Sequence, residues 1–71
     1  MLLIDMQVGE RRTITKVLAP LPQKRRLFDF GFLPNENVKL CFFDKKRGGG
    51  VELGGVVVIF DLTWLSYVEV K

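Results

Sequence analysis

The residue types that most often carry catalysis or bind transition metals are scarce in this chain. It has no histidine and one cysteine, Cys41, so a Cys/His metal site or a Ser/His or Cys/His nucleophile cannot form within one chain. Its eight acidic residues are scattered along the sequence, whereas a hard-cation site needs clustered oxygens. We therefore expect no enzyme, no cofactor and no metal site, and we interpret Cys41 as a packed thiol.

A glycine run, Gly48–Gly50, follows the basic residues Lys45–Arg47 and has the composition of a phosphate-binding loop. A P-loop needs a lysine after its last glycine and then a helix. Here Val51 and a predicted strand follow instead. The run is therefore predicted to be a flexible hairpin tip, and Gly54-Gly55 a turn or bulge.

The net charge is +3, and nine of the eleven basic residues fall into three groups: Arg11, Arg12 and Lys16; Lys24–Arg26; and Lys45–Arg47. Such groups can serve a nucleic acid or an anionic membrane surface, or they can be solvated turns. Acidic residues beside each group weaken its field. A nucleic-acid-binding barrel also needs exposed aromatics among the cations, and only Phe43, near Lys39 and Lys45, meets that requirement.

The chain is expected to be one domain, residues 1–71, without repeats or linkers. No apolar run approaches the roughly 18 residues of a membrane span, and the first residues do not read as a signal peptide. The single cysteine favours a reducing cytoplasm.

Alternation of β-branched and apolar residues predicts several short strands. The predicted strands are Arg11–Leu18, Asn37–Phe43 with Val38, Leu40 and Phe42 on one face, Val51–Leu53, Val56–Phe60 and a last short strand in Tyr67–Lys71. Because Val56–Phe60 has no polar alternation, we expect it to be buried on both faces in the middle of a closed barrel. Asp61 is expected to cap a single helical turn. Short strands in this number indicate a mainly β fold, a small five-stranded barrel.

One helix is predicted at residues 22–30, inserted after the first strand. Pro22 suits its first turn and Gly31 the left-handed position after its end. A turn at Leu33–Glu36 follows, with Asn35 in the left-handed conformation. The predicted core places Leu27 and Phe30 of the helix, together with Gln23 on the same face, over Val38, Leu40, Val58 and Ile59.

The opposite face of this helix is the candidate partner-binding surface. Arg25 points away from the barrel at 100° per residue, with Lys24 beside it, and Phe28 lies three residues further on. An exposed aromatic next to an arginine often anchors a protein interface. The alternative is that Phe28 folds onto a neighbouring loop as cover. Arg26 is expected to brace the helix against a carbonyl or an acid.

The central motif resembles the FeoA family. It consists of Arg26, Leu27, Gly31, Pro34 and Val38 at set spacings, with Val8-Gly9-Glu10 as the opening turn and Ile14 and Val17 in the first strand. The chain departs from the family at Asn35, where glycine is usual, at Phe30 and Phe32, where leucine is preferred, and in the closing segment, where Phe60, Asp61 and Trp64 stand.

This resemblance implies an SH3-like barrel that assists FeoB, the membrane GTPase-linked transporter of ferrous iron, by protein contact in the bacterial cytoplasm or at the inner face of the membrane. It implies no iron held by the chain itself. Similar domains form the tail of iron-dependent repressors, so a homo-oligomerising module is one alternative. A nucleic-acid-binding barrel is the other, and a steep salt dependence of binding would reveal it. Whether the accessory activates or restrains the transporter stays open.

Overall fold

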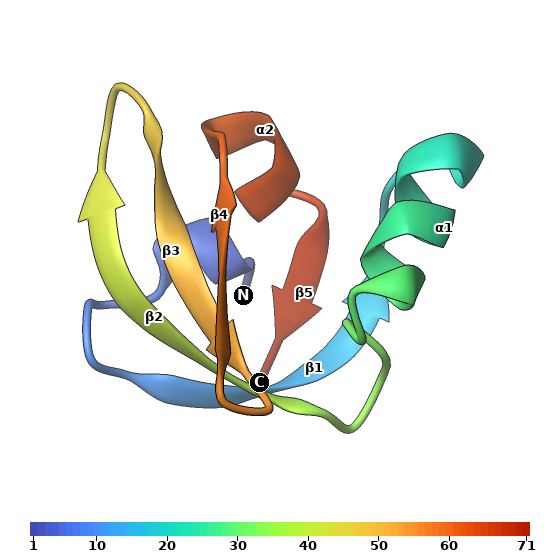
Figure 1. The fold of residues 1–71 in the computed structure, drawn as a ribbon, viewed down its shortest axis with the longest axis horizontal. Helices are drawn as coiled ribbons and strands as arrows, with labels where there is room; N and C mark the ends of the chain where they lie inside the picture. The colour runs from blue at the N-terminus through green and yellow to red at the C-terminus, as the bar shows by residue number, and fades with distance from the viewer.

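The computed structural model describes all residues from Met1 to Lys71 and has a mainly β architecture (Figure 1). Its elements are η1 (Leu3–Asp5), β1 (Arg11–Val17), α1 (Leu21–Asp29), β2 (Asn37–Asp44), β3 (Gly48–Leu53), β4 (Val56–Phe60), α2 (Leu62–Leu65) and β5 (Val68–Val70). The strands form one antiparallel sheet in the order β4-β3-β2-β1-β5. The predicted fold class, five strands with one helix after the first, is confirmed.

The expected closure of the barrel is wrong, because β4 and β5 remain the two edges of an open, curled sheet. β4 pairs only with β3. Val56 and Ile59 are consequently 62% and 73% exposed, and only Phe60 of this strand is buried. The prediction that β4 is buried on both faces, and that Ile59 belongs to the core, is therefore also wrong.

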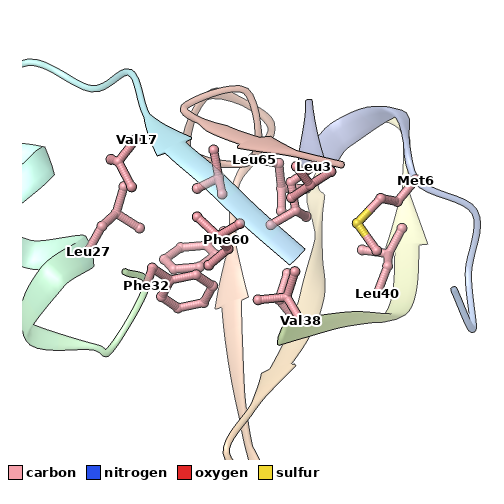
Figure 2. Close-up of a cluster of buried hydrophobic side chains, with 13 residues drawn as sticks. Leu3, Met6, Val17, Leu27, Phe32, Val38, Leu40, Phe60 and Leu65 are labelled. Carbon is pink, nitrogen blue, oxygen red and sulfur yellow. The ribbon is translucent and has the colours of Figure 1, made fainter. Parts of the chain in front are cut away.

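The core consists of thirteen buried hydrophobic residues contributed by all parts of the chain (Figure 2). They are Leu3, Met6, Ile14, Val17, Leu27, Phe32, Val38, Leu40, Val51, Phe60, Leu65, Val68 and Val70. The amino-terminal arm contributes through η1, and the Val70 amide donates to the Met1 carbonyl at 2.7 Å. That bond joins the two ends of the chain.

Helix α1 begins and ends within one residue of the prediction. At its end Gly31 adopts φ 96°. The Gly31 amide donates to the Phe28 carbonyl and the Phe32 amide to the Leu27 carbonyl, both at 2.9 Å. These two bonds form a Schellman motif, which accounts for the glycine.

The end of α1 decides which phenylalanine enters the core. Phe30, predicted to be buried beside Leu27, is 50% exposed, whereas Phe32 is completely buried. The left-handed Gly31 turns the chain so that Phe32 points inward. The Schellman motif commonly brings such a residue against the side chain at the Leu27 position. Leu27 itself is buried as predicted.

The turn after α1 is tied to the first strand. Asn35 has φ 76°, and the Glu36 amide donates to the Leu33 carbonyl at 3.2 Å, as predicted for a turn with Pro34 in its first central position. The Asn35 amide donates to the Ile14 carbonyl, and the Ile14 amide to the Glu36 carbonyl, both at 2.8 Å. The motif residues Gly31 and Pro34 thus connect α1 to β1 and β2.

The glycine run is a buried part of β3, and the prediction of a flexible tip at Gly48–Gly50 is wrong. The hairpin tip is the preceding segment, Lys45–Arg47. Register shifts between Leu40 and Phe42, so Phe42 pairs with Gly50 and leaves the face of Val38 and Leu40 on which it was predicted. Its ring covers Gly50, so that a β-carbon there would overlap the ring. Glycine in the strand makes room for close neighbours.

Candidate functional site: a groove between α1 and β4

Two adjoining hollows lie between α1, the end of β4 and α2, and they share Arg26 and Trp64. We call their combined surface the α1–β4 groove. One hollow is lined by Pro22, Gln23, Arg26 and Trp64, and the other, of about 300 Å³, by Arg26, Phe30, Val58, Ile59, Phe60, Asp61 and Trp64. Most of these residues are apolar, and Arg26 and Asp61 are the charged ones.

Aromatic side chains form the floor of the groove. Trp64 stacks on Phe60 with ring centroids 5.8 Å apart and an interplanar angle of 4°. Phe30 packs against Phe60 with ring centroids 6.1 Å apart and an interplanar angle of 63°. The side chain of Asp61 accepts a hydrogen bond from the Trp64 amide at 3.0 Å, so Asp61 caps the start of α2 as predicted. The cap and the stacking both position Trp64 as part of the floor.

Arg26 has no charged partner. The two ion pairs of the chain are Arg11–Glu52 at 3.2 Å and Arg12–Glu10 at 2.8 Å, and no hydrogen bond from the Arg26 side chain is present. The prediction that Arg26 braces the helix against a carbonyl or an acid is therefore wrong. Its exposed guanidinium offers a fork of donors that matches a carboxylate.

Gln23 lies one helical turn before Arg26 and lines the same groove. Its side-chain oxygen is buried and accepts no hydrogen bond, a state that costs about 1–3 kcal/mol for a buried polar group. The groove itself presents a guanidinium and apolar walls, and it therefore suits a ligand that carries a carboxylate and apolar groups, as an acidic peptide segment does.

Neither a protein-family model nor a curated protein matches the sequence. Solved structures match it over its full length. One is an iron uptake regulatory protein, FeoA, with a TM-score of 0.92, 17% identity, and coverage of 100% of this chain and 95% of that one. Another is FeoA of Stenotrophomonas maltophilia complexed with zinc, described as a procaryotic SH3 domain protein, with a TM-score of 0.90, 20% identity, and coverage of 100% and 89%.

This chain has the FeoA fold. The resemblance drawn from the motif around Arg26 and Gly31 is thereby confirmed at the level of fold, as is the SH3-like architecture. The same fold occurs in a manganese-dependent transcriptional repressor, which this chain matches with a TM-score of 0.90 and 12% identity over 99% of its own length and 40% of the repressor.

In this FeoA fold the predicted partner surface of Lys24, Arg25 and Phe28 is partly brought together. The Lys24 ammonium lies 5.8 Å from the centroid of the Phe28 ring, and Arg25 is exposed. Phe28, however, is half-buried and packs against the core. The more exposed aromatic is Phe30, the C-cap residue that follows α1.

Sequence reasoning missed the contributions of Gln23, Ile59 and Trp64 to this FeoA-fold groove. A usable signal was present in the apolar run Val56–Phe60, which contains no charge or proline and is followed at once by the Asp61 cap. A run of that kind fits an edge strand awaiting a partner as well as it fits a buried strand. Only the pairing of the strands separates the two.

Potential metal ligands do not gather in the FeoA fold of this chain. No group of three or more His, Cys, Asp or Glu side chains lies together. Cys41 is half-buried in β2, and its sulfur lies 3.8 Å from the Lys39 carbonyl oxygen. None of the helices has the length and apolar character needed to cross a membrane.

Proposed function

We propose that this chain is a small accessory protein of bacterial ferrous iron uptake that acts by contact with a FeoB-type membrane transporter. The observation that carries the proposal is the match of the whole chain, end to end, to solved FeoA structures. The FeoA motif around Arg26 and Gly31 supports it independently of the fold. In this role the chain works in the cytoplasm, at the inner face of the membrane.

A contact role agrees with the surface chemistry. The α1–β4 groove presents an unpaired arginine and apolar walls, the composition of a protein-binding hot spot rather than of a catalytic centre. The Lys24, Arg25 and Phe28 surface on the other side of α1 is a second candidate contact, in which Arg25 is the accessible residue.

The test is ferrous iron uptake in the bacterium that carries this chain. Deleting its gene should lower uptake of radioactive ferrous iron, and re-expressing the chain should restore it. A tagged chain should co-purify with the transporter from detergent-solubilised membranes. Unchanged uptake in the deletion strain, with no transporter in the purified fraction, would contradict the proposal.

Self-association is a second candidate function. The repressor that shares the fold and the exposed apolar edge strand β4 both favour it. Sedimentation equilibrium over a wide concentration range tests it directly. A concentration-dependent rise in mass supports an assembly module, and a constant mass of one chain contradicts it.

A further inference from the structure

We propose that the α1–β4 groove and the free edge of β4 together bind an extended, acidic segment of a partner protein, which adds to β4 as a strand and places a carboxylate on Arg26. The proposal rests on the proposed function only in taking the partner to be a protein. It specifies the chemistry of the segment that the chain recognises. This chemistry is an apolar strand with a carboxylate at the end that lies opposite Phe60.

The edge of β4 is open and unprotected. The strand pairs with β3 on one side and with nothing on the other, and Val56, Val57 and Ile59 are 62%, 49% and 73% exposed. Sheet proteins normally protect such edges with lysine, proline or a bulge. Val56–Phe60 contains no charged residue and no proline, and its register with β3 is regular. An edge of this kind is a template for strand addition.

The unpaired positive charge of Arg26 favours a partner segment that is acidic. Arg26 stands in the groove beside the Phe60 end of β4 without a carboxylate partner. Lys24 and Arg25 precede it on the same helix. The other charged group of the groove, Asp61, accepts one hydrogen bond from the Trp64 amide and is paired with no cation. A partner carboxylate at this end of β4 would meet a guanidinium with free donors. Three cations, Lys24–Arg26, stand against this one carboxylate of the groove, so a lysine is the weaker fit.

The remaining groove residues fit the rest of such a segment. Ile59 and Phe30 are exposed apolar side chains on the two walls, and they can cover an apolar side chain of the segment. One extended segment can therefore pair with the free edge of β4 and meet the apolar and charge requirements of the groove at the same time.

A second copy of this chain fits the same edge less well. If two β4 strands paired antiparallel about Val58, Gly55 of one copy would lie opposite Asp61 of the other. No acidic residue would then reach Arg26, because Gly54 and Gly55 form the turn at that point. Charge complementarity thus favours a different protein.

The test uses the fluorescence of Trp64, the only tryptophan of the chain, and the amide NMR signals of β4. The probe is a synthetic peptide of alternating valine and threonine with a glutamate near one end, and a matched peptide carries lysine instead. We expect the glutamate peptide to change the Trp64 emission and to shift the β4 amides, and the lysine peptide to bind about tenfold or more weakly. Equal binding of the two peptides, or no binding of either, would overturn the proposal.

Two forms of the glutamate peptide, N-methylated on alternate residues, test the strand addition itself. Only every second amide of an added strand faces its neighbour. One methylation pattern should therefore abolish binding and the other leave it intact. If both peptides bind alike, the segment does not add to β4. Shifts of the β4 amides on dilution of the chain alone would show that a second copy occupies the edge, which also overturns the proposal.

Arg26→Glu supplies the matched variant, and Arg47→Glu, with the same charge change in the exposed β2–β3 turn, supplies the control. Arg26→Glu should reverse the preference, so that the lysine peptide binds more tightly, while Arg47→Glu should behave like the wild type. Full ferrous iron uptake by cells carrying Arg26→Glu would remove the groove from the transporter contact and leave the proposed function intact. Loss of the proposed function leaves the peptide titration unaffected, so the two failures are distinguishable.

Discussion

Gly48 of β3 lies against the backbone of Phe60 at the end of β4, with no room for a side chain. A β-carbon at Gly48 would overlap the Phe60 carbonyl oxygen and lie 2.7 Å from the Cα of Asp61. Gly48 also has φ 127°, which side-chain-bearing residues rarely adopt. This contact holds β4 and the start of α2 in place, and with them the floor of the groove.

Gly48→Ala should therefore destabilise the fold by roughly 2–5 kcal/mol, from backbone strain and steric overlap combined. Gly54 is the control, because a β-carbon there meets nothing within 4 Å and its φ of 59° lies in the left-handed region. Gly54→Ala should cost about 1–2 kcal/mol. Urea denaturation followed by circular dichroism measures both. Equal costs would show that β3 and β4 are less closely packed than described.

Phe32→Ala should lower the stability of the fold much more than Phe30→Ala does. Phe32 is fully buried, as is Leu27, and truncating such residues costs about 2–5 kcal/mol, a large share of the stability of a small domain. Phe30 is half exposed and packs against Phe60 at a steep interplanar angle, so its truncation should cost about 1 kcal/mol. Thermal unfolding of both variants is the measurement, and a larger loss for Phe30→Ala would contradict the assigned core.

Glu10 should make stability depend on pH on the acid side. The hydrogen bond from the Arg12 side chain, and next the Gln7 amide, lower the pKa of Glu10 below its ordinary 4.5. A carboxyl whose pKa is lowered by folding stabilises the fold above its unfolded pKa and loses this contribution as pH falls through its folded pKa. The stability gap between wild type and Glu10→Gln should thus be full above pH 4.5 and shrink below it. A gap that is constant across this range would refute the assignment.

Arg25→Glu and Phe28→Asp should have different effects on folding. Arg25 is exposed, so its reversal should leave the melting temperature nearly unchanged. Phe28 packs against the core, and a carboxylate in its place would be partly desolvated, so Phe28→Asp should lower the melting temperature. If the predicted partner surface binds the transporter, Arg25→Glu reduces ferrous iron uptake while the protein stays folded. Full uptake with Arg25→Glu would exclude that surface.

Metal binding to the isolated chain should be weak. With no histidine, one half-buried cysteine and no cluster of three potential ligands, neither ferrous iron nor zinc has a set of ligands to bind. Anaerobic titration calorimetry at neutral pH should show only shallow, unsaturated heats. A one-to-one site in the micromolar range would mean that ligands come together in a way this fold does not show.

Several of the predictions that held depend on the conformation of single backbone positions. Pro22, Gly31 and Asn35 each restrict or permit particular φ values, and they placed the helix and the turn after it to within a residue. Asp61 likewise marked the start of α2 through a hydrogen bond three residues away. Such signals act over a few residues, so the linear sequence contains them completely.

Burial of the phenylalanines and of β4 was decided only by tertiary structure. Helical periodicity placed Phe30 in the core, but the chain reverses at Gly31 and brings Phe32 inward instead. The apolar run Val56–Phe60 fits a central strand or an edge strand equally, and its exposure follows from having β3 as its single neighbour. The α1–β4 groove depends on both outcomes. It joins Arg26 to Ile59 and Trp64, residues far apart in the chain, and contacts over such separations are set by how the whole sheet curls rather than by any local pattern of residues.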